Sequence, residues 1–359
     1  MTSAAISLVK KVIPRQGIIK FKQLQTLFSE LGLRVWVVSK WTSSLYYTLI
    51  SREFWREQHA VISGKLKYYE NLNQEKDSDF LLRRNIHRLE KGLIMNPRRD
   101  TFATSYIEST VTSYEKALRA TKRESATNGE LQWAHDVLKQ YFSVVGSHPA
   151  IDGARAKFSA LETIGSEKPH IPYKRDLSKP APVNYDQFLE LSYRRRSVRW
   201  YLPKPVPREL IDQAITAAAL SPSACNRQPF EFRIFDEPEL VQAVSSIPMG
   251  TAGFHHNFPA IIVVVGKLRA YVSERDRHVI YIDGALASMS LMYAFETLGL
   301  SSCPINWPDL EPQESKMKSL LNLEPDERVI MLISVGYPDP DGLIPYSQKK
   351  PLNQIRRYN

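Results

Sequence analysis

Cysteine is scarce in this sequence, which has only Cys225 and Cys303 among its 359 residues. Two cysteines cannot build the disulfide framework that stabilises many secreted folds, and this composition suits a reducing cytoplasm. No stretch approaches the roughly eighteen uninterrupted apolar residues of a membrane-spanning helix. The N-terminus also lacks the apolar core and cleavage site of a secretory signal. These absences predict a cytoplasmic protein that is soluble or, at most, peripherally attached to a membrane.

Two kinds of site are also missing from the pattern. No Gly-x-Gly-x-x-Gly fingerprint is present, so the sequence predicts no Rossmann domain for a dinucleotide. His87 and Glu90 lie three residues apart and share a helix face, but no second histidine or cysteine follows at ligand spacing. Because a stable zinc site needs three or four protein ligands, the pair is interpreted as part of a surface cluster and no metal site is predicted.

Length and an uneven charge are the first positive features. With 359 residues, 43% of them hydrophobic, two domains with a sizeable core are expected. Residues 1–180 hold 29 Lys plus Arg against 18 Asp plus Glu, whereas residues 181–359 hold 19 against 20. The basic excess is N-terminal, so an anionic partner is expected to meet that half, and no nucleic acid is expected.

The pattern divides the chain into a basic, mostly helical region (1–165), a proline-rich linker (166–184) and a second domain (185–359). Over residues 1–70, basic and aromatic side chains alternate, as on an anionic membrane surface or in an amphipathic helical layer packed on the protein. The packed layer is the favoured interpretation. Apolar stripes then predict a helical module within residues 79–165, formed by Leu82, Ile86, Leu89, Leu93, Ile107, Val111, Tyr114, Leu118, Leu131, Ala134, Leu138 and Phe142.

The second domain opens with an arginine cluster, Arg194-Arg195-Arg196-Ser197-Val198-Arg199. Four guanidinium groups and a hydroxyl within six residues can hold a dianionic phosphate through charge-assisted hydrogen bonds. The alternative is a solvated basic turn. We refer to residues 194–199 as the arginine clamp.

Further stretches follow the arginine clamp in a defined order. Proline at the start and an alanine run predict a helix from Pro207 to Leu220. Residues 221–229 form a loop of small and amide side chains, suited to a flat heteroaromatic ring, and residues 230–235 are expected to form a strand. The continuous apolar run over residues 260–265 indicates a second, buried strand.

This order of motifs resembles the FMN-dependent nitroreductase superfamily, which includes an iodotyrosine deiodinase-like branch. The resemblance covers about residues 186–359, where residues 283–294 resemble the central helix and residues 329–338 the last core strand of the family. It implies an α+β, nitroreductase-like fold with a mainly antiparallel central sheet flanked by helices, preceded here by a mostly α-helical N-terminal domain. It also implies a homodimer with FMN at the interface, embraced by C-terminal segments such as residues 344–359.

The resemblance also implies a set of cofactor-binding residues. Arg195, Arg196, Ser197 and Arg199 correspond to the ligands of the FMN phosphate, with Lys349 reaching it from the C-terminal segment. The ring and the ribityl chain would be bordered by residues of the small-residue loop and of a later stretch near flavin N5, namely Ser221, Pro222, Ser223, Asn226, Gln228, Ser301, Ser302 and Cys303. A hydrogen-bond donor near N5 tunes the redox preference of the flavin.

Catalytic side chains are expected to be few, because the cofactor performs the difficult step. His255 and His256 are candidates for a proton donor in the variable substrate cover. Cys303 is a third candidate; Cys225 and Cys303 either relay electrons as a dithiol or, as the favoured interpretation has it, fill space as small buried residues.

The resemblance thus predicts an oxidoreductase with a ping-pong mechanism. NADH or NADPH reduces FMN, and a small electrophilic acceptor, such as a nitro, quinone or enone compound, then takes the electrons. A first alternative is deiodinase-like reductive dehalogenation or other specialised flavin chemistry. A second is a non-catalytic flavin-binding partner or sensor, whose basic N-terminal half docks on an anionic protein, polymer or membrane.

Overall fold

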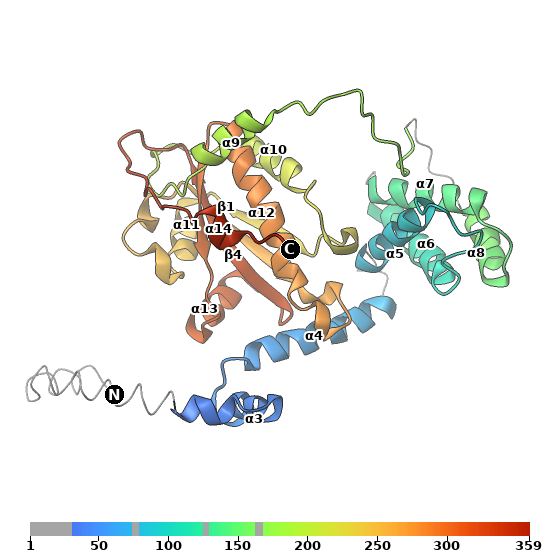
Figure 1. The fold of residues 1–359 in the computed structure, drawn as a ribbon, viewed down its shortest axis with the longest axis horizontal. Helices are drawn as coiled ribbons and strands as arrows, with labels where there is room; N and C mark the ends of the chain where they lie inside the picture. Colours follow the sequence, from blue (N-terminus) through green and yellow to red (C-terminus); the bar gives the residue numbers. More distant parts are fainter. Residues whose placement is uncertain (1–30, 74–78, 125–128, 162–167) are drawn as a thin grey trace, which may run out of the picture. The chain divides into compact units, whose positions relative to one another are not determined.

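The computed structural model describes residues 31–73, 79–124, 129–161 and 168–359. The chain separates into two compact units, Met1–His59 and Ala60–Asn359, whereas the sequence grouped residues 1–165 (Figure 1). The predicted surface layer within residues 1–30 lies outside the described residues, as do residues 166 and 167 of the predicted linker. Residues 168–184 contain no helix or strand.

The described part of the first unit is a short helical segment. Helix α3 (Lys40–Leu45) begins with a capping box, in which Ser39 and Thr42 exchange two hydrogen bonds of 3.1 Å, and continues into the π-helical turn η1 (Tyr46–Ile50). Within these described elements no side chain is buried. Exposed apolar side chains of this segment are Val37, Val38, Trp41, Leu45, Leu49 and Ile50.

The helical module predicted from the apolar stripes is present. Helices α5 (Asp79–Leu93), α6 (Ile107–Glu124) and α7 (Gly129–Val144) enclose a common core with α8 (Pro149–Ser159). Of the twelve stripe residues, Leu93 and Phe142 are partly exposed and the rest are buried. Helix α8 was not predicted; it begins at an N-cap His148, whose Nδ1 accepts from the Ala150 N–H at 3.2 Å, with proline at its first turn.

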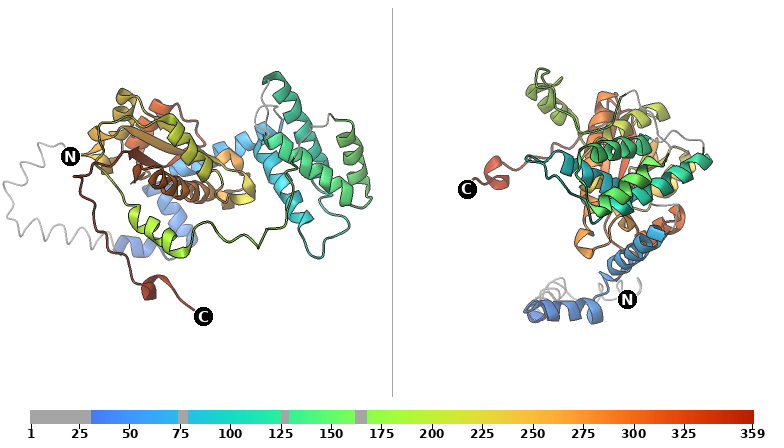
Figure 2. Two further views of the ribbon diagram at one scale, coloured as in Figure 1. Left: turned by 90° about the horizontal axis from the view of Figure 1, so that it is seen from above. Right: turned by 90° about the vertical axis from the view of Figure 1, so that its right-hand side faces the viewer.

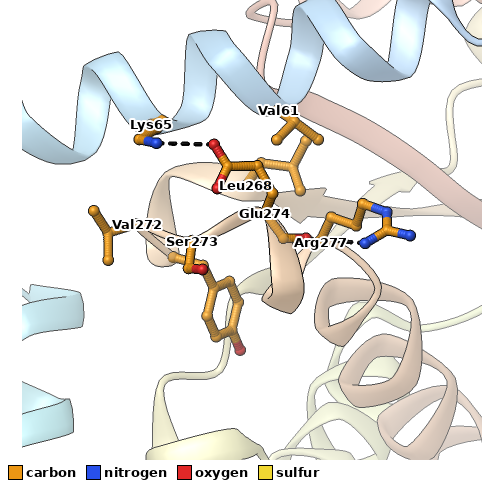
Figure 3. A pocket seen from close by; sticks show the side chains of 8 residues that line it. Val61, Lys65, Leu268, Val272, Ser273, Glu274 and Arg277 are labelled. Carbon is orange, nitrogen blue, oxygen red and sulfur yellow. Dashed lines mark hydrogen bonds and ion pairs between the residues drawn. The ribbon is translucent and has the colours of Figure 1, made fainter. Parts of the chain in front are cut away.

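The later residues of helix α4 (Trp55–Asn73) pack against the loop that follows strand β2 (Ala260–Lys267). Lys65 Nζ lies 2.8 Å from Glu274 Oε1, beside a small pocket that Val61, Leu268 and Arg277 help to line (Figure 3). A Cβ atom at Gly64 would lie 2.7 Å from the Cβ of Leu268 and 2.9 Å from its carbonyl carbon. Glycine therefore permits the close approach of the helix to this loop.

We expect Gly64→Ala to lower the melting temperature, because the new methyl group would press on backbone atoms that cannot move aside. Overpacking of this kind costs about 1–3 kcal/mol, which exceeds the gain of up to about 1 kcal/mol from alanine in a helix. Gly153→Ala in α8 is the matched control, since nothing lies within 4 Å of its added Cβ. It should raise the melting temperature, and an increase in both variants would contradict the packing of α4.

The sheet of the second unit has four antiparallel strands in the order β1-β2-β4-β3 (Figure 1). Strand β1 spans Phe230–Phe235, β3 spans Ser301–Asn306 and β4 spans Glu327–Gly336. The strands predicted at residues 230–235 and 260–265 are confirmed, and the last core strand, expected over residues 329–338, is present as Glu327–Gly336. Strand β3 was not predicted as a strand, because its Ser-Ser-Cys-Pro start has no strand-like alternation.

Helices cover both faces of this sheet. Successive side chains of a strand point to opposite faces, and in β2 the side chains of Ile262 and Val264 join the cluster of α10 (Arg208–Ala218) and α12 (Val279–Thr297). Ile261 and Val263 join the cluster of α11 (Pro238–Ser245) and α13 (Glu311–Leu321). This explains the continuous apolar run, and the predicted α+β fold with helices flanking an antiparallel sheet is confirmed.

The remaining elements are short. They are α9 (Tyr185–Arg194), α14 (Leu352–Ile355), and the 3-10 turns η2 (Ala224–Asn226), η3 (Met249–Thr251), η4 (His255–Asn257), η5 (Leu268–Ala270) and η6 (Glu274–Asp276).

Candidate functional site

The arginine clamp leaves the end of α9 and runs alongside the start of β3. Asn184 and Gln187 form a capping box that begins α9. Beyond the helix, Ser197 pairs with Ser302 in a parallel bridge, and the Val198 N–H donates to the Ser302 carbonyl at 3.1 Å. The structure therefore brings together two groups of predicted cofactor ligands that are a hundred residues apart in sequence.

Two polar atoms in this group are buried and have no hydrogen-bond partner among the described residues: Arg195 Nε and Ser302 Oγ. A ligand or an ordered water usually satisfies buried donors of this kind, and these two lie together where the arginine clamp meets β3. A guanidinium and a hydroxyl are also the donors that a phosphate monoester prefers. The residues present thus fit the phosphate end of FMN.

The other clamp arginines have partners within the chain. Arg196 Nη2 donates to the carbonyls of Pro345, at 2.9 Å, and of Tyr346, which fixes the C-terminal segment on the arginine clamp. Lys349 follows three residues later in an exposed position. Arg199 Nη1 donates to the Ser197 carbonyl at 3.2 Å, and its guanidinium lies 5.7 Å from the ring centre of Phe254.

A buried carboxyl group, Glu296 near the end of α12, lies beside the arginine clamp. It accepts a hydrogen bond from Ser301 Oγ at 3.1 Å and lies 3.5 Å from Arg194 Nε. Burial raises the pKa of Glu296, while the Ser301 hydrogen bond and the charges of Arg194 and Arg195 act in the opposite direction. The sequence analysis missed this residue, since a glutamate in an apolar helix carries no spacing signal.

Asn257 is a second residue that the sequence analysis missed. Its Oδ1 accepts from the Tyr201 N–H at 2.9 Å, and its Nδ2 donates to the Arg199 carbonyl at 3.0 Å. Its amide thus holds the backbone at the end of the arginine clamp.

The two histidines beside Asn257 differ in exposure. His255 is half-buried, with its Nδ1 3.3 Å from Gln242 Oε1, while His256 is exposed and its ring lies 5.9 Å from that of Trp200.

The small-residue loop, residues 221–229, is shaped by Asp283 in the first half of α12. Asp283 Oδ2 accepts from Ser223 Oγ at 2.7 Å and from the Ala224 N–H at 3.0 Å. Ser223 Oγ in turn accepts from the Gln228 N–H at 2.8 Å. Asp283 is only 3% exposed, so these contacts are the internal support of the loop. Ser221 Oγ donates to Ser290 Oγ on the same helix, and Pro222 is exposed.

The backbone of this loop is strained at three positions. Cys225, Asn226 and Gln228 have φ of 53°, 51° and 49°, in the left-handed region that ordinary residues avoid at a cost of about 1–2 kcal/mol each. Strain of this kind persists only where surrounding contacts enforce it, and it concentrates at functional sites. Together with the hydrogen bonds to Asp283, it marks the loop as a preorganised surface.

Within one chain, the two halves of the predicted site lie at different ends of α12 (Figure 1). Asp283 contacts the small-residue loop, and Glu296 contacts Ser301 and the arginine clamp. The separation of thirteen positions corresponds to roughly 20 Å of helix at 1.5 Å per residue. The loop is thus fixed at Asp283 and the arginine clamp at Glu296, while Ser221 of the loop reaches Ser290 between these two points.

The two cysteines belong to these separate halves. Cys303 is buried, and burial raises the pKa of its thiol despite the nearby charges of Arg199 and Arg195. Cys225 is half-buried in the small-residue loop. A disulfide requires Cα atoms within about 7 Å, and a redox role for Cys225 and Cys303 stays a prediction.

The described residues contain no group of three or more His, Cys, Asp or Glu that could hold a metal ion. His87 Nδ1 lies 3.4 Å from Glu90 Oε2, and the other oxygen of Glu90 accepts from Trp133 Nε1 at 3.0 Å. In the part of the chain that the structure describes, no helix combines the length and the apolar character needed to cross a membrane.

The sheet lies between two helical layers and carries the arginine clamp, whose unsatisfied buried donors suit a phosphate group, together with a strained loop. Residues 193–337, which include the arginine clamp and the four strands, match the model of the Nitroreductase family. The match supports an oxidoreductase-type domain with a flavin cofactor.

Three similar proteins illustrate the relationship. The chain is 23% identical to iodotyrosine deiodinase 1 of Pongo abelii over 270 residues, covering 67% of this chain and 91% of the relative. It is 27% identical to iodotyrosine deiodinase of Hydra vulgaris over 192 residues, covering 45% and 68%. Among solved structures, an FMN-dependent nitroreductase from Clostridium difficile R20291 is 24% identical, with 48% of this chain and 99% of that chain covered and a TM-score of 0.41.

Proposed function

We propose that the protein is an FMN-dependent oxidoreductase that transfers electrons from NADH or NADPH to a small electrophilic acceptor by a ping-pong mechanism. The observation that carries the proposal is the pair of unsatisfied buried donors, Arg195 Nε and Ser302 Oγ, where the arginine clamp meets β3. A phosphate monoester would accept hydrogen bonds from both Arg195 Nε and Ser302 Oγ. The family model that covers this stretch supports the same reading.

When bound, FMN supplies the hydride acceptance and the electron transfer to the acceptor. The chain's own residues have the simpler roles of binding and orientation. Arg195, Ser197 and Arg199 would hold the phosphate, and Asn257 would keep the Arg199 backbone in place. Ser302 Oγ would bind the phosphate beside Arg195 Nε, while Ser301 Oγ stays bonded to Glu296. Burial raises the pKa of the Cys303 thiol, which fits a packing role better than a redox role.

A homodimer is part of this proposal, because a single chain fixes the arginine clamp and the Ser223 part of the small-residue loop at different points of α12. One chain would supply the clamp and its partner the loop for each FMN. Exposed apolar side chains on α9 and α12 offer a suitable contact face, since large exposed apolar patches mark interaction sites; these are Tyr185, Phe188, Ile282 and Leu286.

The C-terminal segment supports the same assembly. After β4 it leaves the sheet domain and ends at α14 (Figure 2), and its apolar side chains are exposed. These are Leu343, Ile344, Tyr346, Leu352, Ile355 and Tyr358. An arm with six exposed apolar anchors fits a partner subunit better than water, and it would pass the arginine clamp on its way, where Arg196 holds it.

The function is tested by the visible spectrum of the purified protein. We expect flavin bands near about 370 and 450 nm that bleach on anaerobic addition of NADH or NADPH, and that return when a nitro or quinone acceptor is added. A colourless protein that does not bind added FMN would contradict the proposal. Bound FMN without reduction by either nucleotide would favour the non-catalytic flavin-binding partner instead.

Reductive dehalogenation is the second candidate, and the observation that favours it is the similarity to iodotyrosine deiodinases over most of their length. Chemically reduced protein would then release iodide from an iodotyrosine faster than it reduces a nitroaromatic compound.

The exposed basic and aromatic segment over residues 31–59, with Trp41, Arg52 and Trp55, is the proposed contact for an anionic partner or membrane surface.

A further inference from the structure

One arginine of the helical module contacts the small-residue loop directly. Arg83 on α5 donates from Nε to the Asn226 carbonyl at 2.8 Å and from Nη2 to Gln228 Oε1 at 2.9 Å. Both acceptors belong to residues with positive φ. Arg83 thus grips the loop at two of its three strained positions.

The other side of the Arg83 guanidinium is fixed within the module. Its Nη1 lies 3.2 Å from Glu130 Oε2 on α7, and its Cζ lies 5.6 Å from the ring centre of Trp133 on the same helix. The side chain of Arg83 is 17% exposed, so these contacts are largely shielded from water. The planar guanidinium has fixed donor directions. Because it is bound to α7 on one side and to the small-residue loop on the other, it couples the positions of the two.

Gln228 continues this connection into the loop. Its side-chain amide accepts from Arg83 through Oε1 and donates through Nε2 to the Ala219 carbonyl at 2.8 Å, at the end of α10. Its backbone N–H donates to Ser223 Oγ, which donates to Asp283. The loop is therefore supported from inside by Asp283 and from outside by Arg83.

We propose that Arg83 is a positioning residue for the flavin site, and that the helical module is required to shape the small-residue loop. The module would then be part of the cofactor-binding machinery rather than a separate recruiting domain. This inference rests on the proposed function, since it takes the loop to border FMN, but the link between Arg83 and loop order is tested without flavin as well.

The test compares Arg83→Gln and Arg83→Lys with Arg119→Gln in the full-length protein. Arg119 lies on α6 of the same module, and its side chain is 68% exposed beside Glu115. Lysine keeps the charge near Glu130 but cannot make both loop contacts from one planar group. The control variant changes the charge of the module equally and leaves the small-residue loop untouched.

We expect both Arg83 variants to raise the dissociation constant of FMN about tenfold or more and to shift the midpoint potential of the bound flavin, while Arg119→Gln changes neither. A loss of module stability alone would not move the potential of the flavin that remains bound. In apo-protein, hydrogen exchange of the loop amides should be at least tenfold faster in the Arg83 variants, with the exchange of α6 and α8 unchanged.

The outcomes separate the two ideas. Wild-type affinity, potential and loop exchange in both Arg83 variants would overturn the inference. If wild-type protein binds no flavin, the proposed function fails, and faster loop exchange in the variants still shows that Arg83 orders the loop. If Arg83→Gln unfolds the module, which the loss of far-ultraviolet helical signal would reveal, the Arg83→Lys variant decides.

Discussion

Arg195→Ala is expected to lower the affinity for FMN by a factor of about 100 or more. The substitution removes a half-buried guanidinium whose buried Nε has no partner among the described residues. Hydrogen bonds to a charged group contribute about 1.5–3 kcal/mol each, and two of them correspond to at least a hundredfold in the dissociation constant, at about 1.4 kcal/mol for each factor of ten. Quenching of FMN fluorescence on titration into apo-protein measures the change.

Arg208→Ala is the control for this experiment. Arg208 pairs with Asp236 on the surface of the same domain, through hydrogen bonds of 2.6 and 2.9 Å. The substitution Arg208→Ala removes the same charge from the domain as Arg195→Ala. A general electrostatic effect on the affinity for FMN would therefore appear in both variants. Equal affinities of the Arg195 and Arg208 variants would rule out a specific role of the arginine clamp, and the buried donors would then serve another anion.

Mixed dimers are expected to regain flavin that each parent has lost. A chain with Arg195→Ala lacks a working clamp, and a chain with Ser223→Ala loses the hydrogen bonds of Ser223 to Asp283 and Gln228. If each FMN lies between the clamp of one chain and the loop of the other, the mixed dimer contains one intact site and one doubly defective site. Its flavin content should be half that of the wild-type dimer.

The mixed dimer is obtained by co-expressing the two chains with different affinity tags and purifying through both. The matched control mixes Arg208→Ala chains with Ser223→Ala chains, in which every site has an intact clamp and one has an intact loop. A mixed dimer as empty as its parents would show that the clamp and the loop of one chain form the site. Failure of the two tags to co-purify would contradict the homodimer itself.

Much of the fold could be predicted from local patterns. The stripe through Leu82, Ile86 and Leu89 has helical spacing, and the run over residues 260–265 is buried on both faces of the sheet. Strand β3 and helix α8 could not be predicted this way. Strand β3 owes its position to pairing with β4 rather than to its own residues, and α8 depends on packing against α6 and α7.

Individual site residues could be predicted from the sequence only where they belong to a recognisable motif. The arginine clamp and Ser302 are indeed adjacent, but no motif encodes the contacts that fix the clamp and the small-residue loop at different points of α12. Asn257, Asp283 and Arg83 act through single side chains that meet the site from distant parts of the sequence. Such contacts become visible only when the chain is folded, because nothing in their local sequence distinguishes them from ordinary polar residues.

The contact between Arg83 and Asn226 joins residues 143 positions apart, which has a consequence for the order of folding. During synthesis the chain emerges from its N-terminus, and domains tend to fold as units in that order. The residues of the helical module, 79–161, are synthesised before the small-residue loop, so the module can form its own apolar core first. The loop is then synthesised after the module that binds it. Arg83 can stabilise the strained loop conformation as soon as this conformation forms.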